Sequence, residues 1–462
     1  MNDEHLIAEP SSSNYVTKNR LQRSDEAIHS WYRFVLGYPP HLVTEYLENL
    51  RADPTRDWVF DPFSGTATTP LEARLHGFST ISSDANPIML IAAQVKLAWD
   101  INTVEIQSKI DEVLELAVAC LKNYSMKPVP EDNYQLSLFG SHILRDKSID
   151  NRLASDFNPD TLLPPKAISL IPSGFISKKP LLRVMALRYA IENLIRLQEP
   201  RYFLLLALAN TIVKTASNVG FGPEIYRLPP QDDVDVLGAF ANTVTRMIED
   251  LRAIIGKQQR PFPPAYVFKE DARTLSSLSD YPPIGIVITS PPYPNEKDYT
   301  RITRLENILL GLITSKEDLR ALKSHLLRSN TRNVFIGDDD DSYIQDIPSI
   351  VRVADEIEET RRQLGKTSGF ERLYHRVTRL YFGGMFRHFA ALLPRLRPGA
   401  RCAYVVGDQM SYFRIHIRTA QLLADVAIKA GYKVEGINLW RTRRSTTTRL
   451  DLDENVLIIK RP

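Results

Sequence analysis

Apolar residues follow two patterns along the chain, and each pattern predicts a different kind of element. Short apolar runs bounded by turn residues predict buried strands at 58–60, 79–83, 265–268, 284–289, 401–406, 432–439 and 455–460. Apolar positions three to four residues apart predict helices at 42–50, 70–76, 101–124, 180–197, 202–217, 236–255 and 417–430, and through most of 300–390. Strands that alternate with helices at both ends of the chain predict a largely parallel α/β sheet.

A long helical block separates the second expected strand from the third. A connection of this length is too long to be a simple link within one sheet, so we interpret it as an insertion. We therefore expect an α/β fold with a mostly parallel sheet, an antiparallel last strand and a large helical insertion. The expected parts are a polar N-terminal tail at 1–24, a discontinuous α/β domain at 25–99 and 266–462, and the insertion at 100–265.

Composition narrows the class of protein. The chain has 462 residues, of which 43% are hydrophobic and 24% charged, as is usual for globular proteins. Its net charge of +3 means that any nucleic-acid surface has to be a local basic patch. Two cysteines without ligand-like spacing, Cys120 and Cys402, argue against a disulfide scaffold or a zinc site. With no apolar stretch of membrane-spanning length and no secretory signal, the sequence predicts a cytoplasmic protein. The nine histidines are scattered and form no HExxH-type pair, so no catalytic metal is expected.

The segment Asp61-Pro62-Phe63-Ser64-Gly65-Thr66-Ala67-Thr68-Thr69 joins the first expected strand to the helix that follows it. Gly65 permits a tight turn, and the helix N-terminus offers unpaired N–H groups to a ligand. Asp84 and Asp271 end the next two expected strands, at the sheet edge where open α/β sheets bind ligands. A structural turn with helix-capping aspartates is the alternative. The flanking residues favour a nucleotide-type cofactor site, and the lack of Gly-Lys-Ser/Thr argues against a phosphate loop.

A second segment, Ser290-Pro291-Pro292-Tyr293, directly follows the apolar strand 284–289. An aromatic exocyclic amine is a poor nucleophile because its lone pair is delocalised into the ring. The Ser290 hydroxyl and the Pro291 carbonyl are acceptors that would hold its N–H groups and expose that lone pair. The prolines fix the loop without adding N–H donors, and Tyr293 offers a flat face to an extruded base. A proline-rich turn that only caps a strand is the alternative.

Together and in this order, the two segments resemble the bacterial DNA amino-methyltransferase family, which acts on cytosine N4 or adenine N6. The resemblance covers about 29–98 and 266–310 and, more loosely, 370–462. It implies a Rossmann-like methyltransferase sheet with S-adenosylmethionine as cofactor. Serine at the first position of the Ser-Pro-Pro-Tyr tetrad is typical of cytosine-N4 enzymes. Ala67 departs from the family pattern, because it stands where the family usually has its second glycine.

The resemblance also implies roles for individual residues. The implied catalytic residues are Ser290, Pro291, Pro292 and Tyr293. The implied cofactor-binding residues are Phe34, Pro39, Asp61, Pro62, Phe63, Ser64, Gly65, Ala67, Thr68, Asp84, Ala85, Asn86, Asp271 and Ala272. Basic side chains near the second segment and in a late Thr-rich loop are candidate DNA contacts, with a solvated surface as the alternative. They are Lys297, Arg301, Arg304, Arg441, Arg443, Arg444 and Arg449.

The sequence thus favours a DNA methyltransferase that modifies cytosine N4 in duplex DNA, within restriction–modification or phage defence. Its expected partners are duplex DNA and a cognate restriction endonuclease or defence-system subunits, with no membrane. Three alternatives stay open: an adenine-N6 enzyme, an RNA amino-methyltransferase, and a DNA-binding regulatory subunit with a degenerate cofactor site. The insertion at 100–265 is a candidate DNA-binding and target-recognition domain.

Overall fold

A seven-stranded sheet organises the computed structural model, which describes residues 27–32, 37–126, 151–221, 225–258, 260–444 and 450–462. Its strand order is β5-β2-β1-β6-β7-β9-β8. The strands are β1 (Trp58–Asp61), β2 (Ser79–Asp84), β5 (Ala265–Lys269), β6 (Ile284–Thr289), β7 (Leu396–Gly407), β8 (Lys433–Arg444) and β9 (Asp451–Lys460). Neighbours from β5 to β7 run parallel, and β9 runs antiparallel to both β7 and β8. The α/β, Rossmann-like fold class is therefore confirmed, with its mostly parallel sheet and antiparallel last strand.

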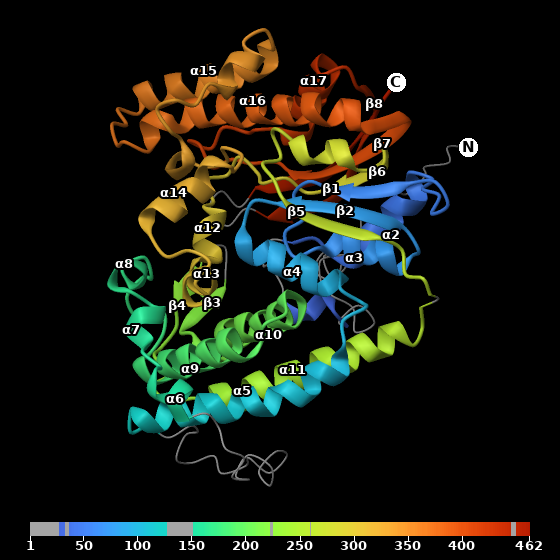
Figure 1. Cartoon of the computed structure of the whole chain (residues 1–462). Helices are drawn as coiled ribbons and strands as arrows, with labels where there is room; N and C mark the ends of the chain where they lie inside the picture. The colour runs from blue at the N-terminus through green and yellow to red at the C-terminus, as the bar shows by residue number, and fades with distance from the viewer. Residues whose placement is uncertain (1–26, 33–36, 127–150, 222–224, 259, 445–449) are drawn as a thin grey trace, which may run out of the picture.

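Helices cover both faces of the sheet (Figure 1). On one face lie α15 (Pro348–Gln363), α16 (Tyr374–Leu392) and α17 (Thr419–Lys429), and on the other lie α2 (Pro40–Asn49), α3 (Thr68–Leu75) and α4 (Pro87–Leu97). Alternate residues of each strand serve the two faces, as the period of a β-strand requires. In β1, for example, Phe60 packs in the core beneath α16, whereas Val59 packs with α2.

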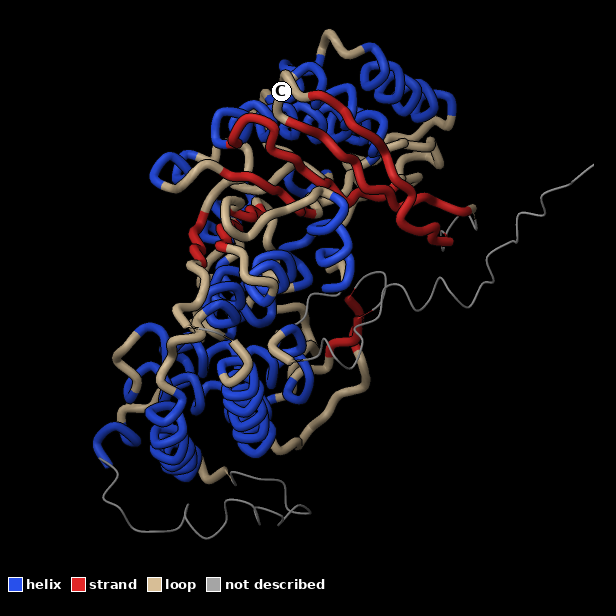
Figure 2. The backbone as a smooth tube through the Cα atoms, turned by 90° about the vertical axis from the view of Figure 1, so that its right-hand side faces the viewer, coloured by secondary structure: helices blue, strands red, loops and turns tan. Residues whose placement is uncertain are grey.

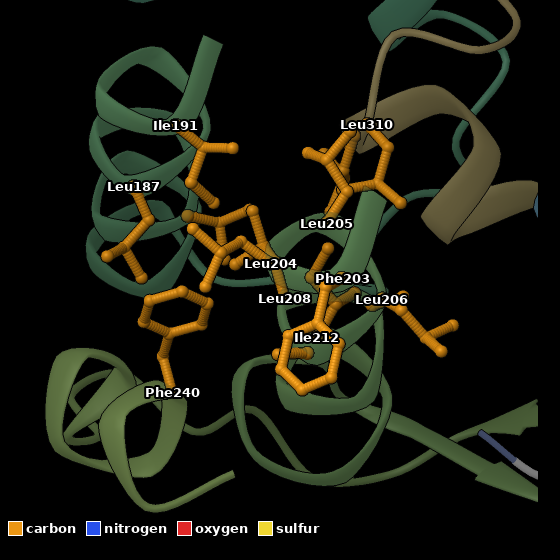
Figure 3. Packing of buried hydrophobic residues seen from close by; sticks show 14 of the residues in the cluster. Leu187, Ile191, Phe203, Leu204, Leu205, Leu206, Leu208, Ile212, Phe240 and Leu310 are labelled. Atoms are coloured by element: carbon orange, nitrogen blue, oxygen red, sulfur yellow. The ribbon is translucent and has the colours of Figure 1, made fainter. Parts of the chain in front are cut away.

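The insertion is built mainly from four helices: α5 (Thr103–Asn123), α9 (Lys178–Leu194), α10 (Gln198–Thr211) and α11 (Val236–Ile255). Figure 2 shows this helical block beside the sheet-bearing part. Leu187, Leu204 and Phe240, one from each of α9, α10 and α11, meet in its core, and Leu310 joins them from the returning chain (Figure 3). The same core includes α4, so the insertion packs directly against the sheet domain. The exact domain boundaries stay a prediction.

Shorter elements complete the described part of the chain. The insertion also holds α6 (Asn151–Ser155), α7 (Pro159–Leu162), α8 (Pro165–Ile168) and a hairpin of β3 (Val219–Phe221) and β4 (Ile225–Arg227), which the apolar pattern did not predict. After β6 come α12 (Tyr299–Ile302), α13 (Arg304–Leu309) and α14 (Lys316–Ser324). Within the described ranges, no helix combines the length and the apolar character needed to cross a bilayer.

One boundary corrects an expectation that matters for the site. The segment from Arg441 was expected to be a loop, but β8 continues to Arg444. Pairing with β9 explains this, because Arg441 lies opposite Glu454 and Arg444 opposite Asp451 in the antiparallel register. Opposite charges facing each other across two strands stabilise the pairing. Arg441, Arg443 and Arg444 are therefore carried on a paired strand.

Candidate active site

A cavity of about 790 Å³ opens at the carboxyl edge of the sheet, and both predicted segments line it. The predicted site residues that line it are Pro62, Phe63, Ser64, Gly65, Thr68, Asp84, Ala85, Asn86, Ala272, Ser290, Pro291, Pro292, Tyr293, Lys297, Arg441, Arg443 and Arg444. β1 and β6 are parallel neighbours, so the loops that follow them come out side by side. Sheet topology thus brings together two segments that are far apart in the sequence. Phe34 and Arg449 lie outside the described residues.

Asp84 holds the first loop in shape. Its carboxylate accepts hydrogen bonds from the Gly65 N–H at 2.9 Å and from the Asn86 N–H at 2.8 Å. Burial raises the pKa of Asp84, and these N–H donors oppose the rise. Gly65 has a φ of +48°, in the left-handed region that favours glycine. The loop that joins β1 to α3 is therefore anchored to the end of β2.

Ala67, which stands where the resembled family usually has its second glycine, has a backbone conformation that suits glycine. Its backbone has φ 66° and ψ 36°, and its side chain is buried behind the loop rather than lining the cavity. A left-handed conformation at this position suits glycine, and alanine adopts it at a cost of about 1–2 kcal/mol. The turn that a glycine would make is therefore retained with alanine in its place.

The Ala67→Gly variant is expected to change the free energy of unfolding by less than about 1 kcal/mol, because relief of left-handed strain is offset by backbone entropy and a lost buried methyl group. S-adenosylmethionine affinity, measured by calorimetry, should stay within about threefold, since the loop already has the glycine-like conformation. A gain in affinity of tenfold or more would instead show that Ala67 impairs the binding of S-adenosylmethionine by this loop.

Asp61 lies beneath the cavity and does not line it, and its contact with the cofactor stays a prediction. It is 1% exposed and accepts hydrogen bonds from the hydroxyl of Tyr38 at 3.0 Å, the hydroxyl of Thr289 at 2.6 Å and the N–H of Phe63 at 3.1 Å. Burial raises the pKa of Asp61 to about 6. Because Thr289 directly precedes Ser290, this carboxylate ties the two loops together.

Asp271 and Pro39 do not line the cavity either, and their contacts with the cofactor stay predictions. Asp271 forms a 2.7 Å ion pair with Arg273, which fixes its carboxylate away from the cavity. Its neighbours Glu270 and Ala272 line the cavity instead. Pro39 caps the start of α2, and the preceding Tyr38 reaches the cavity.

The second loop presents a preorganised acceptor. The Ser290 hydroxyl donates to the Val405 carbonyl at 3.0 Å and also interacts with the Tyr293 side chain, and its oxygen can still accept a hydrogen bond from a ligand. Tyr293 packs its ring against Gly407, where an added Cβ would lie 3.0 Å from the ring. Burial raises the pKa of Tyr293, and the Glu454 carboxylate raises it further. The tyrosine is therefore a neutral aromatic wall of the pocket at neutral pH.

His388 supports the side of the cavity that Phe63 and Ala272 line, and the sequence analysis missed it. Its two ring nitrogens lie 2.7 Å from the Ala272 carbonyl and 2.7 Å from the Tyr404 hydroxyl, and its ring lies 5.2 Å from that of Phe63. Burial lowers the pKa of His388 to about 4, so the ring is neutral at pH 7. A neutral ring donates to the carbonyl and accepts from the hydroxyl. Nothing in the local sequence marks this role, because its partners come from distant segments.

The His388→Gln variant is expected to lose less stability on acidification than the wild-type chain. An unfolded histidine takes up its proton near pH 6.5, whereas folded His388 does so near pH 4, so its stabilising contribution is full above pH 6.5 and lost as the pH falls toward 4. Between pH 7 and 5 the wild-type free energy of unfolding should fall by about 2 kcal/mol more than that of the variant, as urea titrations would measure. Equal slopes for the two chains would contradict this assignment.

A buried lysine, also missed, supports the first loop from behind. Lys96 on α4 is 1% exposed and donates to the Thr66 carbonyl at 2.9 Å and the Tyr32 carbonyl at 2.8 Å. Burial lowers its pKa to about 7. Lys96 therefore connects the first loop to the segment before α2.

The basic candidates fall into two groups. Lys297, Arg441, Arg443 and Arg444 line the cavity, whereas Arg301 and Arg304 do not. Arg304 lies 3.6 Å from Asp298 in an ion pair, and it belongs to α13, whose other residues pack into the core. Of the basic candidates that the structure describes, the first group is therefore the one placed to meet a ligand in the cavity.

Strained backbone marks a further part of the cavity wall that the sequence analysis did not find. Glu296, Phe413 and Arg414 have φ of 66°, 52° and 63°, and all three line the cavity. Left-handed non-glycine residues tend to gather at functional sites, where the surrounding fold enforces them. Tyr374 packs on Phe413 with ring centroids 5.2 Å apart and helps to hold this wall.

Comparison with known proteins bears on the function of the cavity. No protein-family profile matches the chain. It is 25% identical over 340 residues to the type II methyltransferase M.BsoBI of Geobacillus stearothermophilus. The aligned residues make up 71% of this chain and 61% of that protein. The chain is similar to type II methyltransferases. Type II methyltransferases M.AvaI of Nostoc sp. and of Anabaena variabilis match at 26% identity over 168 residues, 35% of this chain and 33% of theirs. The chain thus spans less than two thirds of the length of these relatives.

Proposed function

We propose that the chain transfers a methyl group from S-adenosylmethionine to the exocyclic N4 of cytosine in duplex DNA, as the modification enzyme of a restriction–modification or phage-defence system. The observation that carries the proposal is the cavity at which the Asp61–Thr69 segment and the Ser290–Tyr293 segment meet. The similarity to type II methyltransferases supports methyl transfer to DNA. A cognate restriction endonuclease is part of this proposal.

The cavity fits the cofactor. The Ser64 hydroxyl is buried at the cavity and has no hydrogen-bond partner among the described residues, so it is suited to meet a polar ligand. Asp84 and Glu270 supply carboxylates at adjacent strand ends, where ribose hydroxyls and an adenine amino group could be bound. When bound, S-adenosylmethionine supplies an electrophilic methyl group on a sulfonium centre.

The second loop would bind the target amine. With its proton engaged by Val405, the Ser290 oxygen is an acceptor for one N–H of the amine, and the Pro291 carbonyl is an acceptor for the other. Holding both N–H groups in this way favours a pyramidal nitrogen with an exposed lone pair. Tyr293 would stack on the extruded base, which is the arrangement that enzymes acting on a flipped base require.

The cavity wall near Tyr293 carries the cationic side chains Lys297, Arg441, Arg443 and Arg444. Cationic side chains beside the pocket favour a polyanionic substrate. The large helical insertion, which packs against α4, is proposed to hold the duplex as it delivers the base.

Transfer of label from radioactive S-adenosylmethionine tests the proposal. Unmethylated phage λ DNA should acquire label, a structured RNA should not, and Ser290→Ala should reduce labelling about 100-fold, the order found when a preorganised hydrogen-bonding group is removed. Calorimetry should show that the chain binds S-adenosylmethionine. Label in RNA alone would contradict DNA as the substrate. Absence of cofactor binding would contradict the enzymatic role and favour a regulatory subunit.

A further inference from the structure

A buried carboxylate sits in the cavity wall beside the target loop. Glu454 on β9 is 5% exposed, and its side chain lies next to Tyr293, because a Cβ added at Gly407 would meet Glu454 Cγ at 3.2 Å and the Tyr293 ring at 3.0 Å. A negative charge would repel DNA at this place. Glu454 is therefore not suited to contact the polyanion itself, and its burial requires paired partners within the protein.

Two arginines on β8 are the partners of the Glu454 carboxylate. Arg441 Nε donates to Glu454, and Arg443 Nε lies 3.3 Å from the other carboxylate oxygen. Arg441 also covers the Trp440 ring, with its guanidinium carbon 4.6 Å from the ring centroid. Glu454 thus fixes two guanidinium groups on a rigid strand.

Arg443 is the more available of the two. Its Nη2 donates to the Asp408 carbonyl at 2.8 Å, and with the Glu454 contact this engages two of its N–H groups within the described residues. A guanidinium has five N–H donors, so others remain for a ligand. Its side chain is 33% exposed and lines the cavity. The charge of Arg443 also acts on the Tyr293 hydroxyl, where it offsets part of the pKa rise caused first by burial and then by Glu454.

We infer that Arg443, positioned by Glu454, is a specificity-determining residue that reads the ring edge of the extruded pyrimidine. This inference rests on the proposed function. In cytosine the amine is flanked by N3 and then by O2, two adjacent acceptors on one edge. A guanidinium fork matches two adjacent acceptors, as it does when arginine reads guanine.

The same fork discriminates against adenine. Adenine presents N1 beside its amine, but a C–H group follows where cytosine has O2, so only one of the two hydrogen bonds could form. A site that hydrogen-bonds a substrate rejects an analogue that leaves the donors of the site unpaired. The Arg443–Glu454 pair therefore supplies a chemical reason for cytosine that is independent of the serine in the second segment.

Arg443→Lys tests the inference, because it keeps the charge and removes the fork. The target site is first located by sequencing modified bases in methylated λ DNA, and defined duplexes then carry cytosine or 3-deazacytosine at that position. For the wild-type chain, loss of N3 should lower kcat/KM about 10- to 100-fold, and Arg443→Lys should lower kcat/KM on cytosine by a similar factor. For the variant, cytosine and 3-deazacytosine should then differ by less than about threefold.

Control variants show whether an effect is specific to the Arg443–Glu454 pair, and they distinguish a failure of this inference from a failure of the proposed function. Arg401→Lys alters a similar arginine–glutamate pair on the same sheet, with Glu435, away from the cavity, and should change no rate more than about twofold. Glu454→Gln should mimic Arg443→Lys, and both should bind a duplex without the site within about threefold of wild type. Equal sensitivity of wild type and Arg443→Lys to 3-deazacytosine would overturn the inference while leaving the proposed function intact. A wild-type chain that methylates no DNA would overturn the proposed function itself.

Discussion

The Tyr293→Ala variant is expected to methylate DNA about 100-fold more slowly than the wild-type chain, at the upper end of what one base–aromatic stack contributes. Its affinity for S-adenosylmethionine should stay within about threefold, because Tyr293 belongs to the loop after β6 whereas the proposed cofactor contacts follow β1, β2 and β5. Single-turnover methylation and calorimetry would measure the two effects separately.

Tyr293→Phe is the matched control for this prediction. The phenylalanine ring keeps the flat face packed on Gly407 and loses only the hydroxyl, so we expect at least about one tenth of the wild-type rate. If Tyr293→Ala and Tyr293→Phe were equally slow, the hydroxyl rather than the ring would carry the function. If Tyr293→Ala were as fast as wild type, the pocket assignment would be wrong.

The Asp84→Ala variant is expected to bind S-adenosylmethionine about 10- to 100-fold more weakly. The substitution leaves the Gly65 and Asn86 N–H groups without their carboxylate partner, and it removes the proposed partner of the ribose. Hydrogen bonds to a charged group are worth about 1.5–3 kcal/mol each, which sets the scale of the loss. Isothermal calorimetry with the intact chain would measure it.

Two further variants are controls for the loss of cofactor affinity in Asp84→Ala. Asp84→Asn keeps one acceptor oxygen and should lose affinity to an intermediate degree, whereas the exposed Asp280 can be changed to alanine without effect. Unchanged cofactor affinity in Asp84→Ala would show that the cofactor does not use the end of β2. That result would leave the role of the second loop untouched.

The sheet could be predicted from the sequence because its signals are local. The apolar run before Ser290 and the run before Asp61 both marked strands, and parallel strands place their carboxyl ends at one edge. The meeting of the two segments at one cavity follows from this arrangement of β1 and β6. The strand β8 was underestimated at Arg441–Arg444, because its extension depends on pairing with β9 rather than on apolar residues.

Side-chain directions could not be predicted in the same way. Asp271 and Glu270 are neighbours with similar chemistry, but Glu270 lines the cavity whereas Asp271 is paired with Arg273. The buried position of Asp61 likewise depends on Tyr38 and Thr289, which lie in other elements. Such contacts join distant parts of the chain, and a single sequence carries no pattern for them.

Mass spectrometry of nucleosides from unmethylated λ DNA, treated with the chain and S-adenosylmethionine, would show which base the cavity methylates. We expect N4-methylcytosine in the treated DNA and none after treatment with a variant that combines Ser290→Ala and Tyr293→Ala. N6-methyladenine as the sole product would contradict the base assignment and the role given to Arg443. Treated DNA without either modified base would contradict the proposal that this cavity methylates DNA.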